Sequence, residues 1–217
     1  MTKKDKRLTE KGNVVTERLK EHYSSECALL YQGEAWKLLV LARLSAQCTD
    51  KRVNIVSIPL FNEFPTLKSM AECDIARLEE IIKPCGLYHM KAKDIKSSCQ
   101  ALVSDFGGVV PNNMDDLLSL SGVGRKIANL LLGDIYKMPA IVADTHCIRI
   151  ASRLGFTDKD EKSPLKTENT LKKYIKEDEQ SDFCHRIVQF GREICMARSP
   201  RCNDCFLSDV CENGRKI

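Results

Sequence analysis

The fold is decided by the stretch Leu120-Ser121-Gly122-Val123-Gly124-Arg125-Lys126, which separates two segments with the apolar spacing of helices. Its two glycines let the backbone turn sharply with positive φ and approach a ligand closely. The helix that follows begins with unpaired amides and the positive end of its dipole, so the turn can cradle an anion. A pair of glycines is also compatible with a tight helix-helix turn in which glycine serves only the geometry.

Apolar residues recur at helical spacing over most of the remaining chain. The segments that we expect to be helical are marked by Val14 to Tyr23, Trp36 to Leu44, Asp50 to Ser57, Asp74 to Ile82, Lys91 to Asp105, Met114 to Leu120, Arg125 to Tyr136, Asp144 to Leu154, Thr167 to Ile175 and Asp182 to Ile194. Pro59 is expected to kink or end the third of these helices, because proline removes an amide donor. Alternating strand patterns are almost absent, so the sequence predicts an all-α fold.

Composition narrows the class of protein. The chain has 217 residues, of which 43% are hydrophobic and 29% charged, enough for one large domain or two small ones. The basic N-terminus lacks the apolar core of a secretory signal, and no apolar run reaches the length of a membrane span, so we expect a cytoplasmic protein without a membrane partner. The formal net charge of +4 is a weak clue to nucleic acid, because phosphate binding depends on local clustering of positive charge.

Lys126 and Asp144 each stand at the start of an expected helix. A lysine in the first turn is usually a solvated phosphate contact, but it becomes a nucleophile when burial and neighbouring positive charge lower its pKa. Arg125, the helix N-terminus and the apolar residues that follow supply these conditions in outline. Asp144 is placed to cap the next helix, and the same carboxylate could stabilise a sugar cation developing at C1′ of a nucleotide. We interpret His146 as a polar packing residue in preference to a catalytic one.

Cysteine is the unusual residue, with 11 in the chain. An odd number in a reducing compartment argues against a disulfide framework and towards buried thiols, metal ligands or a catalytic thiol. Four cysteines form the pattern C-x6-C-x2-C-x5-C, namely Cys195, Cys202, Cys205 and Cys211. Four thiolates so close in sequence can surround one metal centre, and the spacing alone leaves zinc and an iron-sulfur cluster equally open.

The other seven cysteines have no ligand-like spacing and are interpreted as packing thiols; they are Cys27, Cys48, Cys73, Cys85, Cys99, Cys147 and Cys184. Cys99 and Cys147 fall within helical patterns, where we expect small buried hydrophobic residues. A catalytic thiol is not expected.

The stretch around Gly122 resembles the helix-hairpin-helix signature. Together with Val142-Ala143-Asp144-Thr145-His146 it resembles the active-site segment of the endonuclease III family of DNA glycosylases, and the resemblance spans about residues 36–211. It implies that Lys126 and Asp144 are catalytic and that a DNA phosphate is bound at the hairpin by Gly122, Val123, Gly124 and Arg125.

The resemblance extends to the C-terminal cysteines, whose spacing matches the [4Fe-4S] loop of that family. It implies that the four cysteines hold such a cluster and present a basic loop to DNA, with Arg192 before it and Arg198 and Arg201 within it. We interpret the cluster as structural.

Two further stretches, Leu44-Ser45-Ala46-Gln47-Cys48-Thr49-Asp50 and Gly86-Leu87-Tyr88, match loops with which the family probes the duplex. The resemblance implies that Gln47 fills the space of an extruded nucleotide and that Leu87 wedges into the base stack. The chain departs from the family pattern at Ser121, where proline is common, at Cys48, where alanine is common, and at Pro59, inside a family helix.

The implied architecture is a helical barrel domain over 28–138 and a discontinuous cluster domain of 1–27 and 139–217, with a cleft between them. The presence of both Lys126 and the cluster favours a monomeric enzyme that flips a damaged pyrimidine out of double-stranded DNA. Excision and β-elimination at the abasic site would proceed through a Schiff base on Lys126. The alternatives are a monofunctional mismatch or other-lesion glycosylase, a non-catalytic iron-sulfur DNA-binding protein, and a zinc protein.

Overall fold

The structure is a computed structural model that describes residues 2–214, and within this range the chain consists of helices and connecting loops without strands. The α-helices are α1 (Lys3–His22), α2 (Ala35–Leu44), α3 (Asp50–Glu63), α4 (Leu67–Ala71), α5 (Ile75–Ile82), α6 (Tyr88–Ser104), α7 (Met114–Ser119), α8 (Arg125–Asp134), α9 (Thr145–Leu154), α10 (Pro164–Tyr174) and α11 (Gln180–Glu193). Three short 3₁₀ helices are η1 (Lys83–Cys85), η2 (Glu177–Glu179) and η3 (Cys202–Asp204). The prediction of an all-α fold is confirmed.

The chain divides into two compact units. The discontinuous unit contains residues 1–26 and 137–217, and the continuous unit contains residues 27–136. Each unit has its own buried apolar residues, and each is described by itself below.

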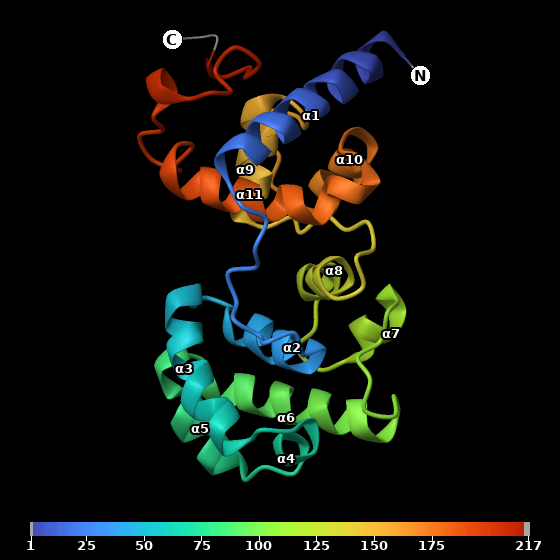
Figure 1. The fold of residues 1–217 in the computed structure, drawn as a ribbon, viewed down its shortest axis with the longest axis vertical. Helices are drawn as coiled ribbons and strands as arrows, with labels where there is room; N and C mark the ends of the chain where they lie inside the picture. The colour runs from blue at the N-terminus through green and yellow to red at the C-terminus, as the bar shows by residue number, and fades with distance from the viewer. Residues whose placement is uncertain (1, 215–217) are drawn as a thin grey trace. The chain divides into compact units, whose positions relative to one another are not determined.

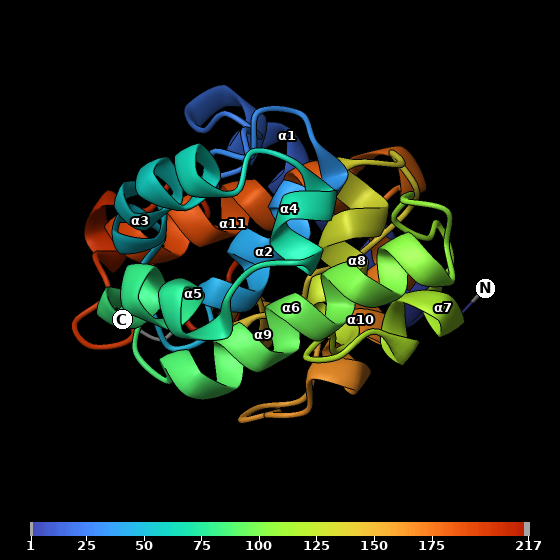
Figure 2. The ribbon, with the colours of Figure 1, turned by 90° about the horizontal axis from the view of Figure 1, so that it is seen from below.

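The continuous unit is built around α2 and α6. Nearly all of α2 is buried, and it contacts α3, α6 and α8. The long helix α6 is covered by α4 and α5, as Figures 1 and 2 show. Side chains of Thr49, Asp74 and Asn113 accept amide hydrogen bonds at the starts of α3, α5 and α7, which explains why those helices begin where they do.

The discontinuous unit joins the two ends of the chain. Helix α1 packs against α10 and α11, and α9 packs against the same two helices (Figure 1). The core between them includes Leu19, Ile150, Leu171 and Phe190, each at most 1% exposed. Because α1 precedes the continuous unit in the sequence and α9, α10 and α11 follow it, this core forms only when both segments of the chain are present.

The main departures from the predicted helices are in α3 and α4. Helix α3 continues through Pro59 to Glu63, so of the two expected effects of Pro59, a kink or an end, the end is wrong and the kink stays a prediction. The amide that Pro59 lacks would have bonded the carbonyl of Ile55, and both residues are exposed, so water can satisfy that carbonyl. Helix α4 was not expected, because its five residues are too short for a periodic pattern; a capping box between Thr66 and Ser69 marks its start.

Candidate nucleic-acid interface and metal centre

The hairpin between α7 and α8 is a tight turn closed by its own backbone. Gly122 has φ of 71°, in the left-handed region, and the Val123 amide donates to the Leu120 carbonyl at 3.1 Å. This is the geometry of a type II turn with glycine at its third position. Among the described residues, the amides of Gly122 and Gly124 donate no hydrogen bond, so these two remain available to an anion.

Helix α8 starts directly after the hairpin without a side-chain cap at Gly124. Its first two residues, Arg125 and Lys126, are both exposed. The positive end of the helix dipole and two cationic side chains therefore share one short segment, which suits a phosphate group. Since Lys126 is exposed, the partial burial that would activate it as a nucleophile does not come from the protein alone.

Asp144 caps α9, as its sequence position indicated. Its Oδ1 accepts a hydrogen bond from the Cys147 amide at 2.8 Å, and the carboxylate is half-buried. His146 contacts the guanidinium of Arg149, with 3.2 Å between Nδ1 and Nη2, which supports its interpretation as part of a polar network. Burial lowers the pKa of His146; the Asp144 charge opposes this effect, and Arg149 and Arg192 add to it.

Gln47 and Leu87 share an uncommon backbone conformation. Gln47 lies in the loop between α2 and α3 with φ of 55°, and Leu87 precedes α6 with φ of 48°. Both side chains are exposed, Leu87 by 48%. Left-handed backbone at a residue other than glycine costs on the order of 1 kcal/mol or more and persists only where the surroundings hold it in place. Each of the two predicted probing residues is thus held outward on a constrained loop.

The four C-terminal cysteines surround one cavity. Cys195, Cys202, Cys205 and Cys211 are all half-buried and line a space of about 80 Å³ beneath Phe190 and Leu207. Among the described residues, no three of these four sulfur atoms lie within 4.8 Å of one another. A single zinc ion at about 2.3 Å from four sulfur atoms would bring them to about 4 Å apart. The arrangement is therefore wider than one zinc ion requires and suits a larger cluster.

Two arginines of α9, which sequence reasoning missed, support this cysteine loop. Arg153 donates from Nη1 to the Cys195 sulfur at 3.3 Å and to the Met196 carbonyl at 2.7 Å. Arg149 donates from Nη2 to the Cys195 carbonyl at 3.0 Å. Positive charge beside a sulfur ligand complements the negative charge of a thiolate-bound cluster. In the sequence, Arg149 and Arg153 look like ordinary charged residues of an amphipathic helix, so no pattern predicts that they contact the cysteine loop.

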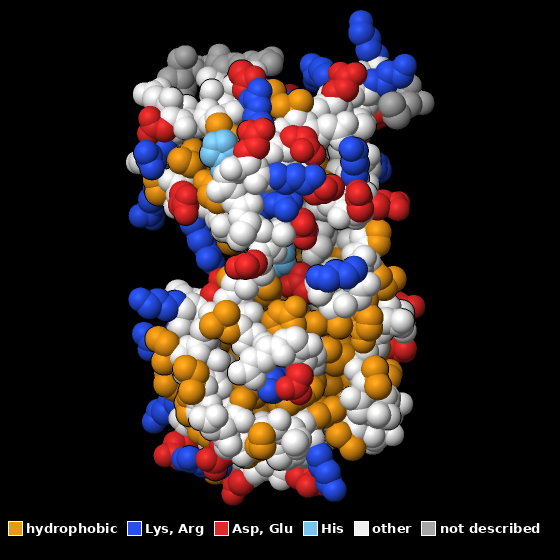
Figure 3. All heavy atoms as spheres, in the orientation of Figure 1, with side chains coloured by type: hydrophobic (Ala, Val, Ile, Leu, Met, Phe, Trp, Pro, Cys, Tyr) orange, Lys and Arg blue, Asp and Glu red, His pale blue; other side chains and the backbone are white. Residues whose placement is uncertain are grey.

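The arginines predicted to contact DNA are all exposed. Arg192 lies in the last turn of α11, and Arg198 lies in the loop between the first two cluster cysteines. Arg201 forms an ion pair with Asp204 at 2.9 Å, so part of its guanidinium is occupied in this structure. On the face in view in Figure 3, basic and acidic side chains are interspersed, in keeping with the small net charge.

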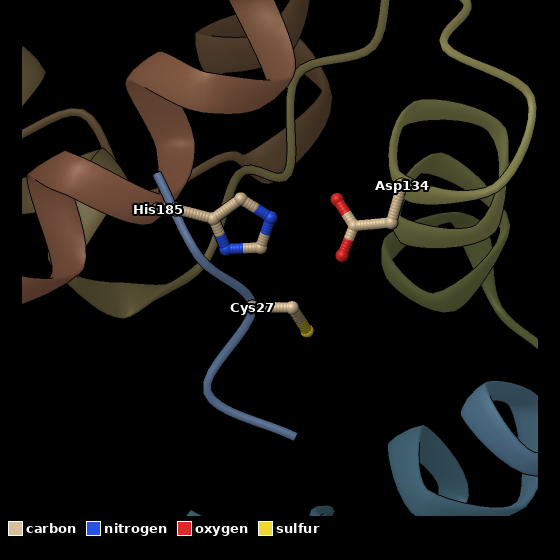
Figure 4. Close-up of side chains that lie close together, drawn as sticks. All are labelled: Cys27, Asp134 and His185. Atoms are coloured by element: carbon tan, nitrogen blue, oxygen red, sulfur yellow. The ribbon is translucent and has the colours of Figure 1, made fainter. Parts of the chain in front are cut away.

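Among the remaining cysteines, Cys73, Cys85, Cys99, Cys147 and Cys184 are buried, as expected for packing thiols. Cys27 and Cys48 differ, because both are half-buried, and Cys27 lies beside Asp134, the last residue of α8 (Figure 4). Burial, together with the Asp134 carboxylate, raises the pKa of Cys27 to about 12. The raised pKa disfavours the nucleophilic thiolate form of Cys27 at neutral pH, and no pattern in the sequence marks Asp134 as its neighbour.

None of the helices that the structure describes combines the length and apolar composition of a membrane-spanning segment.

Comparison with known proteins agrees with the geometry. The family model of the HhH-GPD superfamily base excision DNA repair protein matches residues 40–177, and that of the iron-sulfur binding domain of endonuclease III matches residues 195–211. Endonuclease III of Bacillus subtilis is 39% identical over 193 residues, which cover 88% of this chain and 87% of the relative.

Two solved structures are similar over nearly the whole chain. One is a trapped endonuclease III–DNA covalent intermediate and the other a non-covalent endonuclease III–DNA complex; each is 37% identical with a TM-score of 0.88, covering 96% of this chain and 97% of its own. The expected [4Fe-4S] cofactor is confirmed by the iron-sulfur domain, which begins at Cys195 and ends at Cys211. By family model, sequence identity and fold, the chain belongs to the endonuclease III family within the HhH-GPD superfamily of base excision DNA repair proteins.

Proposed function

We propose that Lys126 is the nucleophile of a base excision repair enzyme that removes damaged pyrimidines from double-stranded DNA and then cleaves the abasic site. As a member of its family, the chain is a DNA glycosylase with abasic-site lyase activity. The observation that carries the residue assignment is the lysine in the first turn of α8, directly after the hairpin. We further propose that the protein acts as a monomer in the reducing interior of the cell, with residues 28–138 as its barrel domain and 1–27 with 139–217 as its cluster domain.

In the first stage, the neutral amine of Lys126 attacks C1′ of the extruded nucleotide. The bond from C1′ to the base breaks, the base leaves with its electron pair, and the amine loses a proton. Because Lys126 is exposed in the protein, we assign its desolvation to the bound DNA, whose backbone would close over it.

In the second stage, the bond from C1′ to the ring oxygen O4′ breaks with its electrons on O4′, which takes up a proton, and the nitrogen lone pair forms the C=N bond of a protonated Schiff base. The Schiff base makes a proton on C2′ acidic. Loss of that proton breaks the bond between C3′ and its phosphate oxygen, which is β-elimination on the 3′ side of the lesion. Hydrolysis of the Schiff base then frees Lys126.

Asp144 is proposed to stabilise the positive charge that develops at C1′ and to assist deprotonation of the amine. The Cys147 amide donates a hydrogen bond to Oδ1 at the N-terminus of α9, so the carboxylate is held in a fixed position for this role. One Asp144 oxygen accepts the capping bond, and the carboxylate is only half-buried, which leaves it accessible to a substrate.

We propose that the hairpin of Gly122, Val123 and Gly124 binds a DNA phosphate through backbone amides, a contact that positions without reading sequence. Since the Val123 amide is engaged within the turn, the direct donors would be those of Gly122 and Gly124. Gln47 would fill the space of the extruded nucleotide and Leu87 would separate the neighbouring bases.

The cysteines Cys195, Cys202, Cys205 and Cys211 would hold the [4Fe-4S] cluster, whose contribution is structural. It would fix the loop that carries Arg198 and Arg201, with Arg192 beside it, for contact with phosphates. No step of the chemistry is assigned to the iron.

Borohydride trapping tests this proposal. The wild-type protein is incubated with duplexes that contain an oxidised pyrimidine or an abasic site, and the reduced protein–DNA adduct is measured. We expect adduct with both substrates, none from Lys126→Gln, and wild-type amounts from the control Lys93→Gln on the exposed face of α6. Adduct formation by Lys126→Gln would refute the assignment, and base release without adduct in the wild type would indicate a monofunctional glycosylase.

A further inference from the structure

Helix α6 carries three polar residues on one face, Lys91, Asp94 and Ser98, although no site assigned above contains them. Their spacing of three and four residues places them in a row along the helix. Lys91 and Ser98 are fully buried, and the Asp94 side chain is 20% exposed. Each of them bonds to a segment outside α6, and each of those segments adjoins one of the predicted DNA contacts.

Lys91 joins the two probing loops. Its Nζ donates to the Leu44 carbonyl at 2.8 Å and to the Cys85 carbonyl at 2.9 Å. Leu44 is the last residue of α2, three residues before Gln47, and Cys85 ends η1, two residues before Leu87. Carbonyls at a helix end lack intrahelical partners, so one ammonium group supplies the partner for both ends and fixes the distance between them.

Asp94 and Ser98 hold the hairpin. The Ser121 hydroxyl donates to Asp94 Oδ1 at 2.9 Å, and the Ser98 hydroxyl donates to the Ser121 carbonyl at 2.6 Å. The other Asp94 oxygen pairs with Arg43 of α2, at 2.6 Å from Nη2. Ser121 occupies the second position of the type II turn, where proline is favoured because its ring fixes φ. The hydrogen bond to Asp94 thus restrains the backbone at Ser121, which the ring of a proline would restrain covalently.

The energetics of Lys91 point away from a purely stabilising role. Taking an ammonium group out of water is costly, and burial lowers the pKa of Lys91 accordingly. The two bonds to carbonyls offset part of this cost, whereas a long apolar side chain would fill the same space without it but would leave both carbonyls without that partner. What the lysine supplies and an apolar side chain cannot is one donor shared by the ends of the two loops.

We propose that Lys91, Asp94 and Ser98 of α6 together fix the relative positions of the Gln47 loop, the Leu87 loop and the hairpin. This arrangement places the three segments for contact with the duplex. Lys91 is the positioning residue for the two probing loops, and Asp94 is the positioning residue for the hairpin. The inference rests on the proposed function, because it concerns how that site opens the base stack.

The test compares two substrates in one assay. Removing a damaged base requires the probing loops to hold an extruded nucleotide, whereas cleavage of a preformed abasic site involves no base to extrude. We expect Lys91→Met to lower kcat/KM for base excision by about 10- to 100-fold, the range that a misplacement of about 1 Å produces, and to lower abasic-site cleavage much less. Fluorescence of 2-aminopurine next to the lesion should show the same loss of unstacking before any chemistry.

The matched control is Lys96→Met. Lys96 lies on the same helix and its Nζ also donates to a carbonyl, that of Cys73 at 2.7 Å, but it touches none of the three segments. This variant should keep the wild-type ratio of the two activities. If Lys91→Met keeps the wild-type ratio of base excision to abasic-site cleavage, whether or not both activities fall, the role of Lys91 is overturned. If Lys91→Met fails to fold, Lys91→Gln, which keeps a donor, takes its place with the same criterion.

A rescue experiment tests whether Asp94 positions the hairpin. Asp94→Ala should weaken binding to abasic duplex, and adding Ser121→Pro should restore most of it, because Leu120 already has the extended backbone that a following proline requires. Failure of the rescue would overturn the role of Asp94. A wild-type protein that neither excises a base nor cleaves an abasic site would instead refute the proposed function, so the two failures are distinguishable.

Discussion

Replacing Gly122 with alanine should destabilise the continuous unit by about 2.5 to 5 kcal/mol, through two separable effects. The first is the backbone, since φ of 71° costs an alanine about 1 to 2 kcal/mol. The second is space, because a Cβ atom at Gly122 would lie 2.6 Å from Arg43 Nε, 2.7 Å from Asp94 Oδ2 and 2.8 Å from Asp94 Cβ. The largely buried ion pair must then move, and losing such a charged hydrogen bond costs about 1.5 to 3 kcal/mol.

Gly107 provides the control that separates these effects. Its φ is 59°, and a Cβ atom there would meet nothing within 4 Å, so Gly107→Ala should show only the backbone cost. Urea denaturation of the two variants and the wild type, with the cluster intact, gives the difference between them. We expect Gly122→Ala to be less stable than Gly107→Ala by about 1.5 to 3 kcal/mol. Equal destabilisation would refute the close approach of the hairpin to Arg43 and Asp94.

Three further predictions concern the discontinuous unit. Asp144→Asn should keep the cap of α9, because asparagine caps as well as aspartate, and lose most turnover, whereas Asp144→Ala should also lose about 1 kcal/mol of stability; denaturation and single-turnover kinetics distinguish the two. Arg153→Met should bleach the visible absorbance of the cluster faster than wild type in the presence of a chelator, with Cys99→Ala as a control that keeps its colour. Burial lowers the pKa of His146 in the folded protein, so the unfolded state binds the proton more tightly. The stability that the neutral His146 contributes is therefore complete above about pH 6.5 and is lost as the pH falls through the folded pKa. If the free energy of unfolding of the wild type, relative to that of His146→Gln, does not fall between about pH 7 and pH 5, this prediction is contradicted.

The helices and the candidate active-site segments could be predicted because their signals are local. Periodic apolar residues mark the long helices, and the hairpin, Lys126 and Asp144 lie within one short part of the chain. The expected end of a helix at Pro59 was wrong because the effect of a proline depends on whether the orphaned carbonyl faces water, which only the fold decides.

Long-range polar contacts left no such signal. Lys91 falls within a helical pattern where a lysine is ordinarily assigned to the solvent side, and its partner Leu44 is far away in sequence. Arg153 and the neighbour of Cys27, Asp134, were missed for the same reason. In each case a polar side chain meets a backbone or carboxylate that is brought near only by packing.

The pairing of α1 with the C-terminal segments has a consequence for how the protein is made. Arg18 of α1 donates to the Phe206 carbonyl at 2.8 Å, and Lys11 donates to the Leu154 carbonyl at 2.6 Å. Residues 27–136 can therefore fold while the segments that follow them are still being translated, but α1, which precedes them in the chain, must wait for α10 and α11 before its apolar stripe is covered. Its many lysines and arginines keep that waiting helix soluble by charge repulsion, so α1 is translated before the continuous unit but packed after it.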